Sequence, residues 1–541
     1  MTVLMECENI SKEYGERIIL DKINFKVSLG ERLGIVGDNG AGKTTLANIL
    51  TGRIEADDGK VVWYKQGVTI GYMKQATEYE ELKDTLSGGE RTRKLLTEVL
   101  YGKYNFIILD EPTNHLDYAG VEWLIKEISK YKGTILIISH DRYFLDQTVN
   151  RVVEIENKRI TNYNGNYSWY RQIKRKEYED SLNLYIQQEK VKERITGQIT
   201  ELKQWSSKAH REAARKAVES GNKKGGKQFN RAKAKRMDAR IKSQIKRLEK
   251  IEVEGVEKPK EEAEIVFKIN KAAKIGAVVV QVEDISKSFG KKVLFNKSSF
   301  YIRHSEKIGI YGPNGCGKST LIKAMLGLND VEGELKINKS RKIGYISQDV
   351  IDLNDEATVL ELFSVDNREQ LGELRTELFL MGFASESLNK KIAVLSLGER
   401  MKLKLLLMIR EKCDILILDE PTNHIDLHVR EQLEEALAKY NGTIILVTHD
   451  RYMLEKICNK LLIFENKSIK RCEYGFAEYL DKKKEQAENN ANKKLAEEKI
   501  ILDNKLAYII GQLSTLNKES QEYKKLAEEY TEILKLKRIY S

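Results

Sequence analysis

Two glycine-rich octapeptides each end in a lysine followed by a hydroxyl residue. The first spans residues 37–44 and the second spans residues 312–319. Backbone N–H groups of such a loop bind phosphate, its lysine reaches the β- and γ-phosphate oxygens, and its hydroxyl holds Mg²⁺. The predicted nucleotide-binding residues are Gly37, Asn39, Gly40, Ala41, Gly42, Lys43, Thr44 and Thr45 in the first copy, and Gly312, Asn314, Gly315, Cys316, Gly317, Lys318, Ser319 and Thr320 in the second.

A carboxylate pair follows a short apolar run in each copy. The runs 106–109 and 415–418 are typical of buried strands, and they end at Asp110 and Asp419. A carboxylate at the carboxyl end of a parallel strand can reach Mg²⁺ in a nucleotide site. The predicted metal ligands are therefore Thr44, Gln75 and Asp110 in the first copy and Ser319, Gln348 and Asp419 in the second.

Glu111 and Glu420 directly follow these aspartates and are placed to polarise the attacking water. His140 and His449 come just after the next predicted strand, where a side chain can touch the γ-phosphate. A single histidine there could be an ordinary surface residue, but both lie 29 positions after the glutamate. We therefore predict that these four residues are catalytic and that the substrate is ATP.

A third motif in each copy starts a predicted helix, whose N-terminal amides suit an anion. It reads Ser87, Gly88, Gly89 and Glu90 in the first copy and Ser396, Leu397, Gly398 and Glu399 in the second. The leucine replaces a glycine, and its side chain limits how closely the backbone approaches phosphate. Tyr14 and Phe289, each just before a glycine, could stack on adenine, although a lone aromatic there would more often pack in a core.

Strands and helices alternate in both copies, which predicts an α/β fold of two tandem cassettes. Gln75 precedes Ser87 by 12 positions, whereas Gln348 precedes Ser396 by 48, so the first copy lacks most of the helical segment that fills the second. The predicted domains are a first cassette at 1–165, a helical interdomain arm at 166–258, a connector at 259–276, a second cassette at 277–483 and a helical C-terminal extension at 484–541.

The arm carries the positive charge of the chain. Residues 166–250 hold 24 Lys/Arg and 10 Asp/Glu, a net +14, whereas the whole chain is +11. Such an imbalance favours contact with a polyanion, although a solvated coiled coil is the alternative. Apolar residues at helical spacing predict two antiparallel helices around a turn at 220–226. The predicted RNA-binding residues are Lys208, Arg211, Arg215, Lys216, Lys223, Lys224, Lys227, Phe229, Arg231, Lys233, Lys235 and Arg236. Phe229 could equally pack between the two helices instead of stacking on a base.

The composition points to the cytoplasm. The five scattered cysteines form no CxxC pair, and no apolar run approaches the roughly 20 residues of a membrane span. The N-terminus does not resemble a signal peptide. The C-terminal stretch has helical periodicity and predicts either a helical pair or one long helix. It is most simply solvated or packed on itself, and contact with RNA is the alternative.

The motifs resemble those of the ATP-binding cassette superfamily, and in particular its ABC-F branch. The resemblance covers residues 1–480 and rests on two cassettes without membrane spans, on DEPTNH-x-D at 110–117 and 419–426, on SHDRYFL at 139–145 and THDRYML at 448–454, and on the basic arm. It implies a monomer with an intramolecular head-to-tail sandwich, in which each ATP lies between one phosphate loop and the other cassette's LSGGE-type motif.

The same resemblance implies binding of the 70S ribosome from its E site, with the arm pointing at 23S rRNA, the P-site tRNA and the peptidyl transferase centre. The arm and extension look most like the antibiotic-resistance group that acts against lincosamides, streptogramin A and pleuromutilins. Three alternatives stay open: a housekeeping factor for stalled ribosomes, a DNA-processing ATPase, and the ATPase subunit of an exporter.

Overall fold

The structure is a computed structural model. It describes residues 2–74, 88–219, 236, 238–251, 255–256, 277–338, 341–347, 353–365, 367–381, 383, 385–422, 425, 427–515 and 521–539. The chain divides into two compact units. The first comprises residues 1–268, 350–407 and 424–440, and the second comprises residues 269–349, 408–423 and 441–541. Residues 350–407 and 424–440, which come from the second motif set, therefore belong to the same unit as the first set. The sequence did not predict this division.

Two sheets in the first unit carry the first set of motifs. The smaller one is antiparallel, in the order β2-β1-β4. The larger one has the order β5-β6-β7-β3-β8-β9. Its first five strands in this order pair in parallel, and the edge strand β9 pairs antiparallel with β8. The strands are β1 (Val3–Tyr14), β2 (Arg17–Ser28), β3 (Arg32–Gly37), β4 (Asp58–Trp63), β5 (Ile70–Met73), β6 (Phe106–Asp110), β7 (Thr134–Ile138), β8 (Arg151–Glu156) and β9 (Arg159–Asn164).

The second unit repeats this arrangement. Its sheets have the orders β11-β10-β13 and β14-β15-β16-β12-β17-β18. Since the strand order recurs element for element, the predicted α/β fold with tandem cassettes is confirmed. The strands are β10 (Val278–Phe289), β11 (Lys292–Arg303), β12 (Lys307–Tyr311), β13 (Glu332–Ile337), β14 (Ile343–Ile346), β15 (Ile415–Asp419), β16 (Thr443–Val447), β17 (Lys460–Glu465) and β18 (Ser468–Cys472).

The central strands form the cores. Every residue of β6, β7, β15 and β16 is buried, as expected for parallel strands covered on both faces. Each fully buried aliphatic or phenylalanine side chain stabilises the fold by about 1.5–3 kcal/mol relative to exposure. These cores hold the ends of the strands in place, and the predicted carboxylates lie at those ends.

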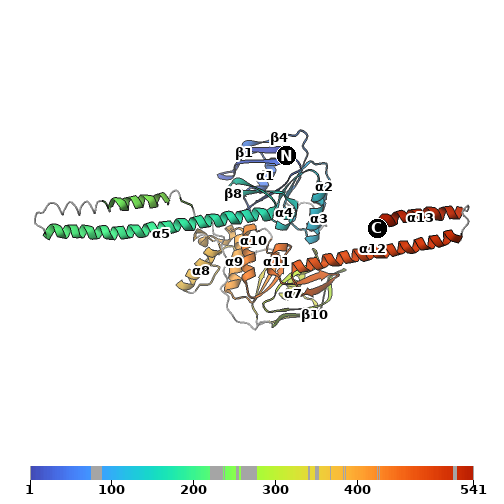
Figure 1. Ribbon diagram of the computed structural model, residues 1–541. Coiled ribbons are helices and arrows are strands. Elements are labelled where there is room, and N and C mark those ends of the chain that lie inside the picture. Colours follow the sequence, from blue (N-terminus) through green and yellow to red (C-terminus); the bar gives the residue numbers. More distant parts are fainter. Residues whose placement is uncertain are drawn as a thin grey trace. The chain divides into compact units, whose positions relative to one another are not determined.

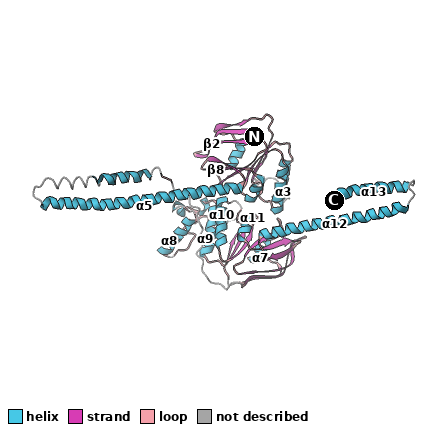
Figure 2. Ribbon diagram, viewed as in Figure 1, coloured by secondary structure: helices cyan, strands magenta, loops and turns pink. Residues whose placement is uncertain are grey.

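Helices follow the strands of both motif sets along the chain (Figure 2). In the first motif set they are α1 (Lys43–Leu50), α2 (Gly88–Leu100), α3 (Tyr118–Lys130) and α4 (Arg142–Thr148). In the second set they are α7 (Lys318–Met325), α8 (Arg368–Leu380), α9 (Leu397–Arg410), α10 (Leu427–Lys439) and α11 (Arg451–Ile457), with short 3₁₀ turns η2 (Ser385–Asn389) and η3 (Ile392–Val394). The long interval of the second copy thus contains α8, η2 and η3, whereas residues 75–87 of the first copy lie outside the described residues.

The arm begins with α5 (Tyr167–Glu219), a helix of 53 residues. At about 1.5 Å per residue it is roughly 80 Å long, and Figure 1 shows it as one continuous helix. Residues 238–251 form the returning helix, and Ile195, Ile199 and Ile241 are buried between the two. The predicted antiparallel pairing is therefore confirmed over the described residues, while the turn at 220–226 lies outside them.

The C-terminal region is a pair of helices, α12 (Phe476–Thr515) and α13 (Gln521–Ile539), which pack through Leu506, Ile509 and Ile533 (Figure 1). Of the two predicted alternatives, the pair is the one observed. The first helix begins inside the predicted second cassette and continues past residue 484 without a break. Within the described residues, no helix is long and apolar enough to cross a bilayer.

Candidate nucleotide-binding sites

The first phosphate loop connects β3 to α1. Gly42 caps the helix with a φ of 100°, a left-handed conformation that favours glycine. A Cβ there would also lie 2.8 Å from a methyl carbon of Ile19. Lys43 Nζ donates to the carbonyls of Gly37 at 2.7 Å and Asp38 at 2.9 Å. The loop therefore wraps around the Lys43 ammonium group, and the N-terminus of α1 lies at the end of the loop.

The second phosphate loop has the same geometry between β12 and α7. Gly317 caps α7 with a φ of 109°. Lys318 Nζ donates to the carbonyls of Gly312 at 2.9 Å and Pro313 at 3.1 Å. Both loops thus present helix N-terminal amides and a lysine, the groups that bind the phosphates of a nucleotide.

A hydroxyl and a carboxylate meet in each predicted metal site. Thr44 Oγ1 donates to Asp110 Oδ2 at 2.9 Å, and Asp110 is 1% exposed. In the second site, burial raises the pKa of Asp419, while a hydrogen bond from Ser319 lowers it. Oxygen ligands of this kind fit Mg²⁺, which binds through few protein groups and keeps several waters. The third predicted ligands, Gln75 and Gln348, lie outside the described residues.

Glu111 is buried beside His140 in the first site. The backbone N–H of His140 donates to Glu111 Oε2 at 3.4 Å, and His140 Nε2 lies 3.6 Å from Glu111 Oε1. Burial raises the pKa of Glu111 to about 7, against the opposing charge of Lys43. Burial and the same lysine lower the pKa of His140 well below its ordinary value, so its ring is neutral at pH 7.

The second site repeats this pair. The N–H of His449 donates to Glu420 Oε2 at 3.4 Å, and its Nε2 lies 3.4 Å from Glu420 Oε1. Burial raises the pKa of Glu420 to about 8. Both glutamates have a φ near 50°, a strained conformation that non-glycine residues rarely adopt. Among the described residues, Oε1 of each glutamate is buried and accepts no hydrogen bond, and the ring of the paired histidine is the neighbouring polar group.

The signature motifs differ in sequence at their second residue. Ser396 and Glu399 form a capping box at the start of α9, with Ser396 N and Oγ donating to Glu399 Oε2 at 2.9 and 2.8 Å. Leu397 is 48% exposed at the start of that helix, so its side chain projects where the first copy has a glycine. In that copy, Gly88, Gly89 and Glu90 open α2, whereas Ser87 lies outside the described residues.

Tyr14 and Phe289 lie at matching hairpins, at the ends of β1 and β10. They are 51% and 56% exposed, so neither ring packs in a core. Lys12 Nζ lies 5.8 Å from the Tyr14 ring centre, and Lys287 Nζ lies 5.4 Å from that of Phe289. The structure thus leaves both rings free of the core and able to stack on a base.

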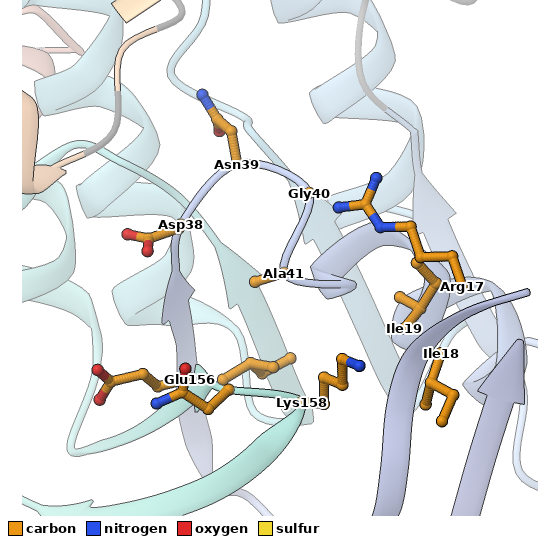
Figure 3. A pocket seen from close by; sticks show the side chains of 11 residues that line it. Arg17, Ile18, Ile19, Asp38, Asn39, Gly40, Ala41, Glu156 and Lys158 are labelled. Carbon is orange, nitrogen blue, oxygen red and sulfur yellow. The ribbon is translucent and has the colours of Figure 1, made fainter. Parts of the chain in front are cut away.

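A cavity beside the first phosphate loop is lined in part by residues that the sequence did not identify as site residues. It has a volume of about 200 Å³ and is lined by the loop, by the start of β2 and by the turn after β8. In Figure 3 the Arg17 side chain extends toward Gly40, and a Cβ on Gly40 would lie 3.9 Å from Arg17 Nη2. Lys292 occupies the matching place near Gly315. A cation two positions after the glycine of each hairpin, Arg17 after Gly15 and Lys292 after Gly290, is the sequence signal for this feature.

The predicted RNA-binding residues are only partly described. Lys208 and Arg211 are exposed on α5, and Arg236 is exposed in the returning segment of the arm. Arg215 and Lys216 lie in α5. The others lie outside the described residues: Lys223, Lys224, Lys227, Phe229, Arg231, Lys233 and Lys235.

Known proteins with similar sequences share this architecture. A family model described as ABC transporter matches residues 20–80 and 295–423, and another with the same description matches residues 153–224. The ribosome protection protein VmlR of Bacillus subtilis (strain 168) is 34% identical over 556 residues, which cover 99% of this chain and 98% of VmlR. The energy-dependent translational throttle protein EttA of Mycobacterium tuberculosis (strain CDC 1551 / Oshkosh) is 28% identical over 539 residues, which cover 85% of this chain and 90% of EttA.

A solved structure of the archaeal ribosome recycling factor aABCE1, in complex with the stalk protein aP1, is similar in fold. The TM-score is 0.53 at 19% identity, and the match covers 86% of this chain and 89% of that one. The similarity to VmlR extends over both sets of ATPase motifs and over the long helix between them. We conclude that the chain is an ATPase of the ABC-F family.

Proposed function

We propose that this protein binds the 70S ribosome in the E site with two ATP molecules bound, and that it relieves antibiotic inhibition of peptide bond formation. The observation that carries the proposal is the end-to-end similarity to a ribosome protection protein. The drugs that we propose are lincosamides, streptogramin A and pleuromutilins. We place the protein in the cytoplasm as a monomer, with its two cassettes closing on each other.

The arm supports this function through its length and charge. Helix α5 is long enough, at about 80 Å, to extend well beyond the cassette that it leaves. The arm segment 166–250 carries a net +14, which suits a surface of RNA phosphates. We propose that its tip meets the P-site tRNA and 23S rRNA, and that its shaft provides salt-sensitive contacts.

The two glutamates support ATP hydrolysis as the step that ends each cycle. Burial raises the pKa of Glu111 and Glu420, which makes each ionised carboxylate a stronger base toward water. His140 and His449 are held against these carboxylates through their backbone N–H groups. Bound Mg²⁺ would neutralise charge on the phosphates, and Thr44, Asp110, Ser319 and Asp419 would hold it.

The proposal is tested with the Glu111→Gln/Glu420→Gln variant. It should keep ATP binding but lose at least about 10²-fold in turnover, the usual contribution of a general base. On a sucrose gradient with ATP, it should therefore sediment with 70S particles, and without ATP it should not. Hydrolysis near the wild-type rate would contradict the catalytic assignment. Sedimentation with added duplex DNA in place of ribosomes would select a DNA-processing ATPase.

A housekeeping role in translation is a second candidate, favoured by the similarity to EttA, whose name describes a translational throttle. The two roles differ in a drug phenotype. Expression of the wild-type chain in a drug-sensitive bacterium should raise the minimal inhibitory concentration of at least one of the three drug classes. Ribosome binding without any such rise would select the housekeeping role.

A further inference from the structure

Charged side chains connect α10 to the first ATP site and to the base of the arm. This α10 charge cluster consists of Arg142, Arg171, Arg430, Glu431 and Glu434, all within the first unit. Arg142 forms an ion pair with Glu434 through both terminal nitrogens, with Nη1 at 3.3 Å from Oε2. The two side chains are 9% and 2% exposed. Removing either partner would deprive a buried charge of its main counter-charge, which is unfavourable.

Arg430 reaches the catalytic loop itself. Its Nη1 donates to the backbone carbonyl of His140 at 3.0 Å. Arg142, two residues after His140, is the first residue of α4, and Asp141 is the N-cap of that helix. Helix α10 therefore holds this loop at two points, the His140 carbonyl and the first residue of α4. Since the N–H of His140 donates to Glu111, the position of the loop sets how the two catalytic residues face each other.

Glu431 connects the same helix to the arm. It forms an ion pair with Arg171 in the second turn of α5, and its Oε1 lies 4.0 Å from Arg142 Nη1. Next to Arg171, Tyr170 OH donates to Glu154 Oε1 on β8 at 2.6 Å, and Lys174 Nζ lies 3.0 Å from Glu154 Oε2. The base of the arm is thus fixed between β8 and α10, and a shift of α5 relative to α10 must break the Arg171–Glu431 pair.

We propose that α10 positions the His140 loop of the first ATP site and couples it to the base of the arm through the α10 charge cluster. Arg430 is a positioning residue, because it acts on the backbone that carries His140 and not on the reacting atoms. Arg171 transmits the position of the arm to α10. The inference rests on the proposed function only in that the first site hydrolyses ATP.

The internal repeat indicates that this coupling serves one site only. Counterparts in the two copies lie 309 positions apart, as Asp110 and Asp419 do. Arg430, Glu434 and Arg171 then correspond to Val121, Ile125 and Leu480, none of which can form an ion pair. Glu122, the counterpart of Glu431, instead accepts a hydrogen bond from Tyr143 OH at 2.6 Å. Arg142 keeps a charged counterpart, Arg451, which pairs with Glu455 on its own helix. The second site therefore lacks most of the groups that make the connection in the first.

The test measures ATP turnover by the full chain carrying Glu420→Gln, so that the first site supplies the activity. Arg430→Gln should lower kcat about tenfold, within the ~10²-fold that a misplacement of about 1 Å can cost, and should leave KM within about twofold. Arg430→Lys keeps one donor and should recover most of kcat. Loss of kcat in both variants, or a rise in KM without a change in kcat, would overturn the positioning role.

The connection to the arm is tested at Arg171, with a matched control one turn along the same helix. Arg171→Leu should lower the first-site kcat about threefold, a fraction of the ~10²-fold misplacement limit. The charge swap Arg171→Glu/Glu431→Arg should restore it. Arg175, whose side chain is 81% exposed, provides the control Arg175→Leu, which should have no effect. Equal kcat values for Arg171→Leu and Arg175→Leu would overturn the coupling.

A second measurement does not depend on turnover. In the nucleotide-free protein, hydrogen exchange of the amides at 139–145 should be faster in Arg430→Gln than in the wild type and in Arg175→Leu. Unchanged exchange would overturn the positioning role. If the Glu111→Gln/Glu420→Gln variant still hydrolyses ATP, the proposed role of Glu111 in catalysis is wrong. The hydrogen-exchange measurement would then decide by itself whether Arg430 positions the His140 loop.

Discussion

At the scale of single residues, the two glutamates that we propose as catalytic share one environment. Glu111 and Glu420 follow a fully buried strand and accept a hydrogen bond from the N–H of the histidine 29 positions later. Burial raises the pKa of both carboxyls. One difference between the copies lies elsewhere, in the half-exposed Leu397 of the second signature.

Leu397 predicts unequal ATP sites. In the head-to-tail arrangement that we propose, the first phosphate loop meets the Leu397 signature and the second meets the Gly88–Gly89 signature. Glu420→Gln, which disables the second site, should therefore lower total turnover more than Glu111→Gln does. Steady-state phosphate release by the two single variants checks this order. Equal losses, or the reverse order, would exclude Leu397 as the cause.

At the scale of elements, ion pairs fix the ends of strands in the second unit. Arg471 on β18 donates to both oxygens of Glu306, at 2.9 and 2.8 Å, and Lys460 on β17 donates to the same carboxylate at 2.7 Å. Burial would raise the pKa of Glu306, but hydrogen bonds from Arg471, from the Arg303 backbone and from Lys460 lower it to about 2. Glu306 therefore ties the turn before β12 to the β17–β18 hairpin, which lies more than 150 positions later in the sequence.

The lowered pKa of Glu306 predicts loss of stability in acid. A carboxyl whose pKa is lower in the folded state stabilises the fold above its unfolded pKa of about 4.3, and this contribution disappears as the pH falls toward 2. The Tm of the wild type should therefore fall between pH 5 and pH 2.5, and Glu306→Gln should flatten part of that fall. The exposed Glu334 offers the control Glu334→Gln. A wild-type slope retained in Glu306→Gln would exclude Glu306 as a source.

The arm, also an element, should supply the salt-sensitive part of ribosome binding. Neutralising Lys223, Lys224 and Lys227 to Gln removes three charges near the predicted tip. For each phosphate that these lysines neutralise, the substitution should reduce the slope of log affinity against log salt by about 0.9, the value for a duplex. Binding to 70S particles measured at several salt concentrations checks this, and an unchanged slope would mean that these lysines are only solvated.

At the scale of the whole molecule, protection should depend on the tip of the arm more than docking does. The cassettes and the shaft of the arm offer many contacts, whereas the predicted turn at 220–226 is small and distal. Deleting 222–225 withdraws the tip by about 5 Å. Drug protection in cells should be abolished, and ATP-dependent ribosome binding should be kept. Retained protection would show that the tip is dispensable, while loss of both would make the tip part of the anchor.

The sequence by itself determined the fold class and the ATPase motifs, because these depend on short-range chemistry. Glycines at positive φ form the phosphate loops, apolar runs form buried strands, and Asp110 and Asp419 follow as the chain leaves each strand. Helical periodicity predicted the arm and the C-terminal helices for the same reason. The C-terminal alternatives, a pair or a single helix, stayed open, because periodicity alone does not show where two helices separate.

Only the tertiary structure decided how distant elements meet. Arg430 and His140 are 290 positions apart, and nothing in the local pattern of α10 distinguishes a charge that reaches a catalytic loop from one that faces solvent. The same holds for Arg171 and Glu431, and for Arg17 beside the first phosphate loop. Such contacts depend on how sheets and helices pack together, and packing is set by the burial of many apolar side chains at once.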